Sequence, residues 1–427
     1  MNLKDSNKPV IGWVMYDWAV SAFSTTVMAG FFPVFFKQFW SHGADATVTT
    51  ARLGAANSLA GLLIALIAPA IGAIADSGSA RKKFLFMFAY LGVLMTTSLF
   101  LVQQGDWKLA IFCYTIATIG YAGGNIFYDS LLPSITSKKR MDFISSLGFS
   151  IGYLGGGVLF AVNVWMALSP ATFGLASAEK AVQYSFLSVG IWWGLFSIPI
   201  FLFVEEPSQS KKLSYFNIIQ DGLKRLGKTF REIKAHKPIF LFLAAYWLYI
   251  DGVDTIIVMS INYGMSIGLQ STDLIKALLL VQFVGFPAAI GFGYLAGVIG
   301  TKRSIYIAIS IYFIMSVSGA FIHTITEFYI LAISIGLVQG GVQALSRSFY
   351  AKIIPIYKSA EYFGFYNMIG KFAAIIGPVL IGGTALFAKY AGAGDNLASR
   401  ISISSIALLF LAGGILLIFV KEETKLD

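Results

Sequence analysis

Twelve long apolar segments constrain the fold of this chain more than any other feature. A helix that crosses the hydrocarbon core of a bilayer needs about 20 mostly apolar residues. Segments of this kind run over residues 11–38, 52–75, 84–104, 108–133, 142–168, 181–204, 239–264, 272–298, 303–324, 328–351, 362–388 and 402–420. Lipid offers no hydrogen-bond partners to the backbone. Spans of this length therefore form helices, in which the backbone N–H and C=O groups bind one another. The sequence therefore predicts an all-α membrane protein with twelve transmembrane helices.

Composition supports this prediction and argues against other classes of protein. Hydrophobic residues make up 57% of the 427 residues and charged residues 12%, whereas a soluble domain carries roughly 25% charged residues. The single cysteine, Cys113, has no partner for a disulfide within the chain. The three histidines are scattered, and neither a P-loop nor a cysteine pair occurs. We therefore expect no enzyme, no nucleotide-driven pump, no metal site and no cofactor.

The formal charge of +10 carries information about topology. The termini and the even-numbered connections between spans hold 22 of the 31 Lys and Arg residues, whereas the odd-numbered connections hold about seven. Cytoplasmic loops carry an excess of these residues. We therefore predict a protein of the inner (cytoplasmic) membrane with both termini in the cytoplasm, and no nucleic-acid partner.

The longest polar stretch separates two groups of six spans. We predict an N-terminal six-helix half at 1–204, a cytoplasmic linker at 205–238 and a C-terminal six-helix half at 239–427. Within the linker, apolar residues recur at three- and four-residue spacing with basic residues between them, which is the pattern of an amphipathic helix. Such a helix either lies on the anionic cytoplasmic leaflet or packs under the bundle.

Recurring landmarks indicate an internal duplication. A glycine-containing end of the second span precedes a basic pair, and the eighth span ends in a similar way at an offset of 221 residues. A Trp and Asp pair of the first span recurs in the seventh at an offset of 234. The landmarks are Gly72, Asp76, Arg81 and Lys82; Gly293, Gly297, Lys302 and Arg303; Trp13 and Asp17; and Trp247 and Asp251. This arrangement resembles the major facilitator superfamily, which implies two pseudo-symmetric six-helix halves.

Four local motifs narrow the resemblance to one branch of that superfamily. They occupy residues 15–23 (MYDWAVSAF), 249–255 (YIDGVDT), 340–348 (GGVQALSRS) and 361–371 (EYFGFYNMIGK). Together they look like the vacuole-effluxer-like family, which is related to fungal vacuolar amino-acid exporters. The resemblance implies amino-acid export. Asp129 and Asp254 depart from it, since asparagine and glutamine are expected there.

Charged residues within the spans are the candidates for function. A charge at the bilayer centre costs about 2.5–3.5 kcal/mol on insertion scales, so such residues are rare and usually functional. The resemblance implies that spans one, four, seven and ten line a central cavity, and the candidate charges on those spans are Asp17, Asp129, Asp251, Asp254 and Arg347. Lys371 lies at similar depth in span eleven. An embedded acid can also serve only to pair with a base and hold helices together.

We assign these residues to three predicted sites. The substrate or proton-coupling site comprises Asp17, Asp251, Asp254, Tyr16, Tyr249 and Lys371. We expect Lys371 to lie within hydrogen-bonding or water-bridged distance of Asp251 or Asp254, because an unpaired ammonium at this depth is costly. Asp129 and Arg347 form a predicted inner gate. Gly72, Asp76, Arg81 and Lys82 form a predicted conformational loop motif, in which Asp76 caps a neighbouring helix in one state.

Three functional hypotheses follow. The first is a proton-coupled secondary transporter of a small polar solute, such as an amino acid or peptide, working by alternating access as a monomer in the lipid bilayer. The second is a transporter of a cationic species, such as a metal ion or polyamine, because four embedded aspartates exceed two basic residues. The third is a lipid scramblase, receptor or membrane enzyme on a transporter-like bundle.

Overall fold

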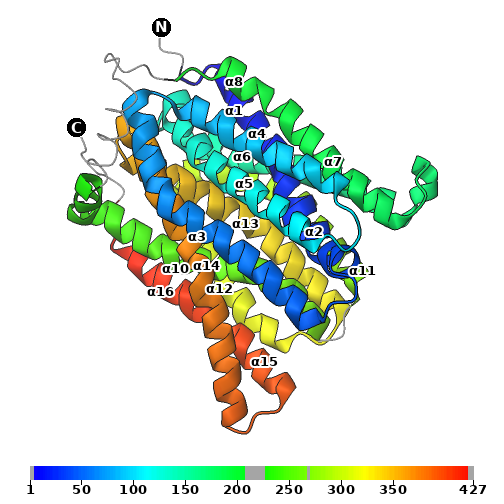
Figure 1. Ribbon diagram of the computed structural model, residues 1–427. Coiled ribbons are helices and arrows are strands. Elements are labelled where there is room, and N and C mark those ends of the chain that lie inside the picture. The colour runs from blue at the N-terminus through cyan, green and yellow to red at the C-terminus, as the bar shows by residue number, and fades with distance from the viewer. Residues whose placement is uncertain (1–3, 207–226, 267–269, 422–427) are drawn as a thin grey trace. The chain divides into compact units, whose positions relative to one another are not determined.

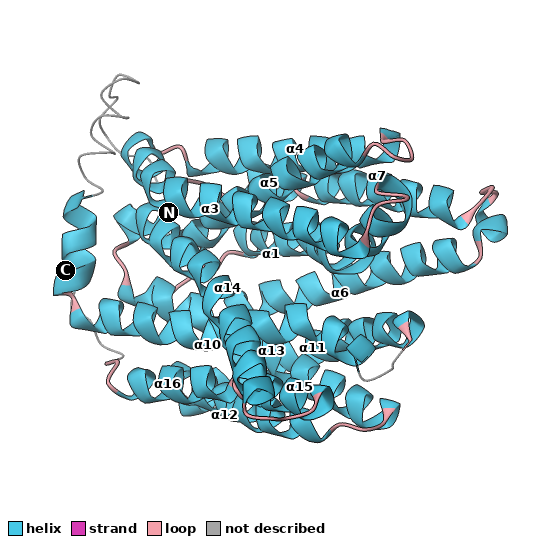
Figure 2. Ribbon diagram, turned by 60° about the horizontal axis from the view of Figure 1, so that its bottom comes forward, coloured by secondary structure: helices cyan, strands magenta, loops and turns pink. Residues whose placement is uncertain are grey.

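The computed structural model describes residues 4–206, 227–266 and 270–421, and every regular element within them is helical (Figures 1 and 2). Twelve helical segments among these residues are long and apolar enough to cross a membrane. The prediction of twelve transmembrane helices is therefore confirmed in number.

The helices before the linker form the first six spans. They are α1 (Asn7–Ala22), α2 (Phe32–Phe35), α3 (Ala46–Gly78), α4 (Arg81–Ser98), α5 (Trp107–Ile135), α6 (Met141–Leu168), α7 (Ala178–Phe196) and α8 (Ile198–Phe203). The helices after it are α10 (Lys237–Ser266), α11 (Ser271–Ile299), α12 (Thr301–Ser318), α13 (Ile325–Ile353), α14 (Ser359–Tyr390), α15 (Asp395–Ser404) and α16 (Ala407–Ile418).

Three spans are interrupted where the apolar pattern suggests continuous helices. The first span contains two π-helical stretches, Phe23–Phe31 and Phe36–Trp40. The sixth span breaks between α7 and α8, just before Pro199, which cannot donate the backbone hydrogen bond of a continuous helix and whose ring crowds the preceding turn. The twelfth span is divided into α15 and α16. Average hydropathy does not report such breaks, because it is insensitive to backbone hydrogen bonding.

Local sequence explains where individual helices begin. Thr324 and Glu327 form a capping box at the start of α13, in which Thr324 Oγ1 accepts from the Glu327 N–H at 3.3 Å. The Glu327 carboxylate accepts in return from the Thr324 N–H at 3.0 Å. Ser177 caps α7 in a similar way, because its hydroxyl accepts from the Lys180 N–H. These caps satisfy amides that have no partner inside the helix.

The chain divides into two compact units that do not follow the six-span halves strictly. Unit 1 is formed by the described residues that fall within Met1–Ser137, Ile151–Leu223 and Ser359–Gly364. Unit 2 is formed by the described residues within Lys138–Ser150, Lys224–Lys358 and Phe365–Asp427. The start of α6 therefore belongs to unit 2, and the start of α14 belongs to unit 1. The division of the chain at the linker did not anticipate this exchange, and the three-part domain division stays a prediction.

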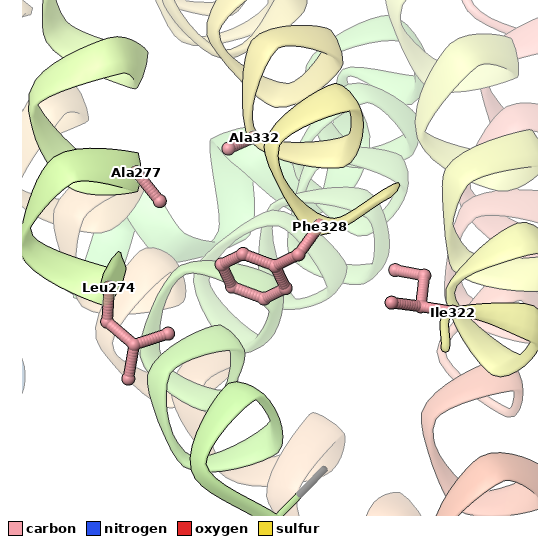
Figure 3. Packing of buried hydrophobic residues seen from close by; sticks show 5 residues of the cluster. All are labelled: Leu274, Ala277, Ile322, Phe328 and Ala332. Atoms are coloured by element: carbon pink, nitrogen blue, oxygen red, sulfur yellow. The ribbon is translucent and has the colours of Figure 1, made fainter. Parts of the chain in front are cut away.

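Close helix packing forms the interior of each unit. In unit 1, α4 lies beside α5, and in unit 2, α11 lies beside α13 (Figure 1). Figure 3 shows one cluster where α11 meets the start of α13, formed by Leu274, Ala277, Ile322, Phe328 and Ala332. Between helices in lipid, van der Waals packing of this kind is a main source of cohesion.

The described end of the linker is a helix at residues 227–235 that packs on unit 2. Thr229 and Ile233 are buried. The Glu232 carboxylate lies 2.6 Å from the Lys358 ammonium, which is held just before α14. For this segment these contacts favour a helix packed under the bundle, whereas residues 207–226 of the predicted amphipathic helix lie outside the described residues.

Candidate functional site

Asp251 is fully buried and bound by hydrogen bonds within unit 2. The Gly377 N–H of α14 lies 3.0 and 2.9 Å from the two carboxylate oxygens of Asp251, and the Thr255 hydroxyl lies 3.3 Å from one of them. A Cβ at Gly377 would overlap Thr255, so only glycine lets α14 approach this closely. Asp251 therefore joins α10 to α14, with its charge stabilised by a backbone donor.

Asp254 stands one helical turn further along α10 and has a different environment. Its side chain is half-buried, whereas Asp251 has no exposed surface. Opposite charges act between Asp254 and Lys371 of α14, and Asp251 adds a like charge nearby. Asp254 and Lys371 thus attract one another in the membrane-spanning part of unit 2. The predicted hydrogen-bonding or water-bridged contact of Lys371 with Asp251 or Asp254 stays a prediction.

Aromatic side chains surround this part of α10. The Tyr249 hydroxyl lies 2.7 Å from Ser346 Oγ of α13. Tyr246 stacks on Tyr366, with ring centroids 4.1 Å apart, and Tyr350 stacks on the same ring at 5.0 Å. Tyr249 is therefore a buried link between α10 and α13, and no described contact brings its hydroxyl to the carboxylates.

In unit 1, Asp17 has a partner that the sequence did not indicate. The Tyr128 hydroxyl donates to Asp17 Oδ2 at 2.6 Å. Trp13 fixes Tyr128, because its indole N–H donates to the Tyr128 carbonyl at 3.0 Å and the two rings stack at 4.5 Å. Tyr16 packs against the same ring at 4.9 Å. Asp17 therefore belongs to an aromatic cluster between α1 and α5.

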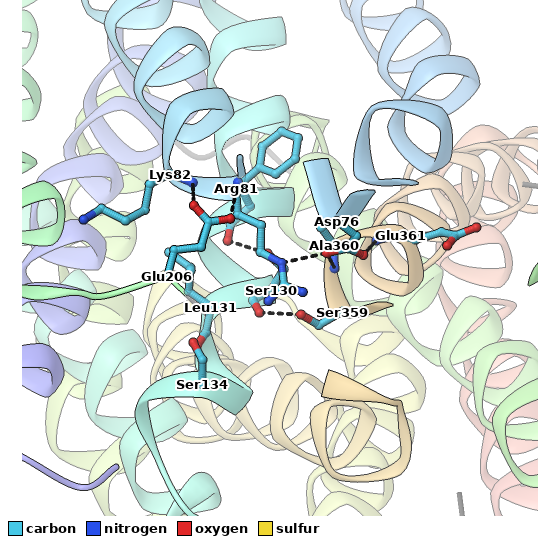
Figure 4. Close-up of polar contacts among 11 residues, drawn as sticks. Asp76, Arg81, Lys82, Ser130, Leu131, Ser134, Glu206, Ser359, Ala360 and Glu361 are labelled. Carbon is cyan, nitrogen blue, oxygen red and sulfur yellow. Dashed lines mark hydrogen bonds and ion pairs between the residues drawn. The ribbon is translucent and has the colours of Figure 1, made fainter. Parts of the chain in front are cut away.

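Asp76 caps the start of α14 within unit 1 (Figure 4). Its carboxylate accepts from the Glu361 N–H at 2.8 Å and the Ala360 N–H at 3.3 Å. Arg81 Nε lies 2.6 Å from the same carboxylate, and both side chains are buried. This is the helix-end contact expected of Asp76, because a carboxylate is stabilised at a helix N-terminus. Whether the contact changes between states stays a prediction.

Backbone packing brings the same two helices together. A Cβ at Gly72 would overlap the Ala360 carbonyl, and a Cβ at Gly364 would lie 2.6 Å from the Ala68 carbonyl. The Ser359 hydroxyl also donates to the Ser130 carbonyl of α5 at 2.8 Å (Figure 4). Gly72 thus acts through the close approach of α14 to α3.

Lys82, the last residue of the loop motif, binds the backbone at the end of α8. Its ammonium donates to the carbonyls of Phe201 and Val204 at 2.9 and 2.5 Å, and so closes the end of α8. The Glu206 carboxylate accepts from the N–H groups of Arg81 and Lys82 at the start of α4, at 2.6 and 3.2 Å. Glu206 is a residue that the sequence analysis missed.

A corresponding arrangement joins the start of α6 to α12 and α13 in unit 2. Asp142 is 6% exposed and accepts from the Ser348 hydroxyl at 2.6 Å and the Thr301 hydroxyl at 2.8 Å. The Lys352 ammonium forms a short ion pair with the same carboxylate. In unit 1 the acid, Asp76, lies on α3 and binds the start of α14, whereas here the acid, Asp142, lies on the incoming helix α6.

Arg347 binds the same part of α6. Its Nε donates to Ser145 Oγ at 2.9 Å, and Nη2 donates to the Ser145 carbonyl at 2.9 Å. The guanidinium lies over the Phe149 ring, 4.4 Å from its centroid. Two hydrogen bonds and a cation–π contact therefore hold a helix of the first six spans against a helix of the last six.

Comparison with known proteins identifies the family. The model of the family described as "Vacuole effluxer Atg22 like" matches residues 46–426. The chain belongs to the Atg22-like vacuole effluxer family. It is 39% identical over 427 residues to an uncharacterised MFS-type transporter, YxiO, of Bacillus subtilis (strain 168), covering 100% of this chain and 97% of the relative. It is 22% identical to autophagy-related protein 22 of Eremothecium gossypii, covering 88% and 85%.

Solved structures give the fold of this Atg22-like chain. The proton:xylose symporter XylE matches with a TM-score of 0.67 at 13% identity, covering 97% of this chain and 94% of that one. A bacterial homologue of the iron transporter ferroportin, in an outward-facing state, matches with a TM-score of 0.66 at 14% identity, covering 96% and 98%. The protein is a multi-pass membrane transporter of the major facilitator fold, and neither its family nor its fold is that of an enzyme.

The structure brings some of the predicted site residues together and keeps others apart. Asp251, Asp254 and Lys371 gather between α10 and α14 in unit 2, whereas Asp17 and Tyr16 lie in unit 1. Of the predicted gate, Asp129 belongs to unit 1, where it is 9% exposed, and Arg347 belongs to unit 2. Their link stays a prediction.

Replacing Arg347 by alanine is expected to favour the inward-open state of the transporter. The substitution removes the two hydrogen bonds to Ser145 and the predicted link to Asp129, and coupling between states is typically about 1–3 kcal/mol. The measurement is thiol labelling from the cytoplasmic side of a cysteine placed at Ser134, in a Cys113→Ser background. Arg400→Ala serves as the control, because Arg400 binds the Ile322 carbonyl at 3.1 Å, away from α6. Unchanged labelling would argue against the gate.

Proposed function

We propose that this effluxer-family protein moves a small polar solute, amino-acid or peptide-like, across the cytoplasmic membrane in exchange for or together with protons. In this proposal both termini are cytoplasmic, the protein works as a monomer, and the central site alternates between the two sides of the membrane. The family relatives and the fold support the general activity of a transporter.

The observation that carries the proposal is the pairing of Asp254 with Lys371. Opposite charges attract strongly in a low-dielectric interior, but each charge has also lost its water. A solute that carries both an ammonium and a carboxylate offers each residue a new partner of opposite charge. A proton on Asp254 would release Lys371 in a similar way. The pair therefore supplies one site at which solute and proton compete.

The two neighbouring acids are less suited to this task. Asp251 is fully buried and both of its oxygens face the Gly377 N–H. Asp17 is bound by the Tyr128 hydroxyl in unit 1. Asp254 is half-buried and has a counter-charge on the long side chain of Lys371, so it is the group that we assign to coupling.

The proposal is tested by flux in proteoliposomes that contain the purified protein. A screen of amino acids and dipeptides by thermal stabilisation first selects candidates, because a solute that binds the folded protein at 100 times its Kd stabilises it by about 2.7 kcal/mol. A selected radiolabelled solute is then expected to accumulate above equilibrium when a pH gradient is imposed, and a protonophore should abolish accumulation. Equal flux with and without the gradient would contradict proton coupling.

A second candidate function is transport of a cation, such as a metal ion or polyamine. The observation in its favour is the cluster of two aspartates on one turn of α10, Asp251 and Asp254, close to a single lysine. The same vesicles distinguish the two, because divalent cations or polyamines would then compete with the labelled solute, whereas zwitterionic solutes would not stabilise the protein.

A further inference from the structure

A cavity of about 700 Å³ lies between the start of α12 and the end of α16 in unit 2. Three basic residues line it, Lys302, Arg303 and Lys421, together with Tyr306 and three branched aliphatic side chains. The combination of several cations with an apolar wall is suited to an amphipathic anion.

The three basic residues differ in whether groups of the chain already bind their side chains. The Lys302 ammonium donates to the carbonyls of Ile418 and Val420 at 2.9 and 2.6 Å, and therefore closes the end of α16. Arg303 and Lys421 are exposed. Among the residues that the structure describes, no carboxylate pairs with either of them, so their charge is available to a ligand.

A similar arrangement, with a carboxylate of the chain bound to it, occurs in the first six spans where α4 begins beside the end of α8. There, Lys82 closes the end of α8 through the carbonyls of Phe201 and Val204, as Lys302 closes α16. The Tyr90 hydroxyl binds the Gly194 carbonyl at 3.1 Å, and Tyr306 binds Gly414 at 3.0 Å. In the first corner the Glu206 carboxylate accepts from the first amides of α4.

The two corners differ by one cation after a matching valine. Val204 is followed directly by Glu205 and Glu206, whereas Lys421 stands between Val420 and the acids Glu422 and Glu423. The second corner thus carries one more cation than the first directly after the valine, and its two acids lie outside the described residues. In the first corner a carboxylate binds the first amides of α4, and the second corner has an additional cation that an anion from outside the chain can meet.

We propose that the cavity binds the phosphate headgroup of an anionic phospholipid in the cytoplasmic leaflet. Arg303 and Lys421 would contact the phosphate, because basic pockets between helices on this side hold anionic headgroups. The predicted orientation places the α11–α12 connection in the cytoplasm. The cavity is larger than a carboxylate requires. Exposed apolar side chains beside it offer a surface to acyl chains, namely Val298, Ile418 and Phe419, which are 83%, 60% and 63% exposed.

The test measures the thermal midpoint of the full-length protein in vesicles of phosphatidylcholine with a rising fraction of phosphatidylglycerol. A lipid that binds the folded protein raises the midpoint as its fraction rises. The double variant Arg303→Gln, Lys421→Gln should need about 25-fold more phosphatidylglycerol for the same rise, since each surface charge contributes about fivefold. In pure phosphatidylcholine it should match the parent, which checks that it folds.

Lys83→Gln is the matched control, because Lys83 occupies the position in the first corner that Arg303 occupies in the second. It should respond to phosphatidylglycerol as the parent does, and an equal loss of response would mean that only general surface charge matters, overturning the site. Inorganic phosphate that reproduced the rise in pure phosphatidylcholine would assign the cavity to a soluble anion instead. A last variant, Glu422→Gln, Glu423→Gln, tests whether the chain's own acids occupy the cavity. A lowered midpoint in pure phosphatidylcholine, together with an increased response to phosphatidylglycerol, would assign the cavity to those acids.

Discussion

Asp254→Asn is expected to abolish accumulation driven by a proton gradient while solute exchange across the membrane persists. Asparagine is close in shape to aspartate but cannot take up a proton in the relevant range, so the transporter loses its coupling step. Exchange of labelled for unlabelled solute needs only the conformational change, and this step remains. The effect should be complete for accumulation and at most severalfold for exchange.

The measurement compares gradient-driven uptake with counterflow in the same batch of proteoliposomes. Asp273→Asn is the matched control, because Asp273 lies at the start of α11 in an exposed pair with Lys276, 3.4 Å away. It should leave both activities unchanged. Full gradient-driven uptake in Asp254→Asn would transfer the role to Asp251 or Asp17. If the asparagine variants of all three kept it, proton coupling through these acids would be wrong.

The number of spans could be predicted from the sequence because it depends on one-dimensional information. A run of about 20 apolar residues is sufficient to identify a span, and neither the neighbours of a helix nor its exact path affects that count. The family was predicted for a similar reason, since the motif at residues 15–23 is local. The contact of Asp76 with a helix start was expected from the loop pattern around Arg81.

The partners of the charged groups could not be predicted in the same way. Tyr128 is 111 positions from Asp17, and its hydroxyl is recognisable as a partner only once α1 and α5 are side by side. Gly377 contributes a backbone N–H to Asp251, and no residue type signals a backbone donor. A glycine directly before Pro378 in an apolar span was the one available hint of an irregular helix at that point.

Asp142 is the clearest residue that sequence reasoning missed. It follows Lys138, Lys139 and Arg140, so it resembles an ordinary acid at a helix start in a basic loop. Its partners are 159 to 210 positions away. Only the packing of α6 against α12 and α13 makes this acid the centre of a buried polar group.

Asp142→Ala is accordingly expected to lower the free energy of unfolding by about 3 kcal/mol. Removing one partner of a buried ion pair costs about 3–5 kcal/mol, because the other charge stays desolvated. The lower end applies, since 22% of the Lys352 side chain remains exposed and water can reach the ammonium. The hydroxyls of Ser348 and Thr301 lose their acceptor as well. The measurement is equilibrium unfolding in detergent micelles, on the variant and on the parent.

A double-mutant cycle with Lys352→Met separates the ion pair from the rest of the polar group. When both charges are absent, no buried ammonium lacks a partner, so the double variant should be more stable than the sum of the two single losses predicts, by about 0.5–3 kcal/mol. Asp273→Ala provides the exposed comparison, because 66% of the Lys276 side chain is exposed and surface pairs contribute about 0–1 kcal/mol. A loss for Asp142→Ala as small as that for Asp273→Ala, or strict additivity in the cycle, would mean that the charge of Asp142 does not hold α6 against α13. The start of α6 would then depend on Arg347 and its two hydrogen bonds to Ser145, and Arg347→Ala would be the more destabilising change.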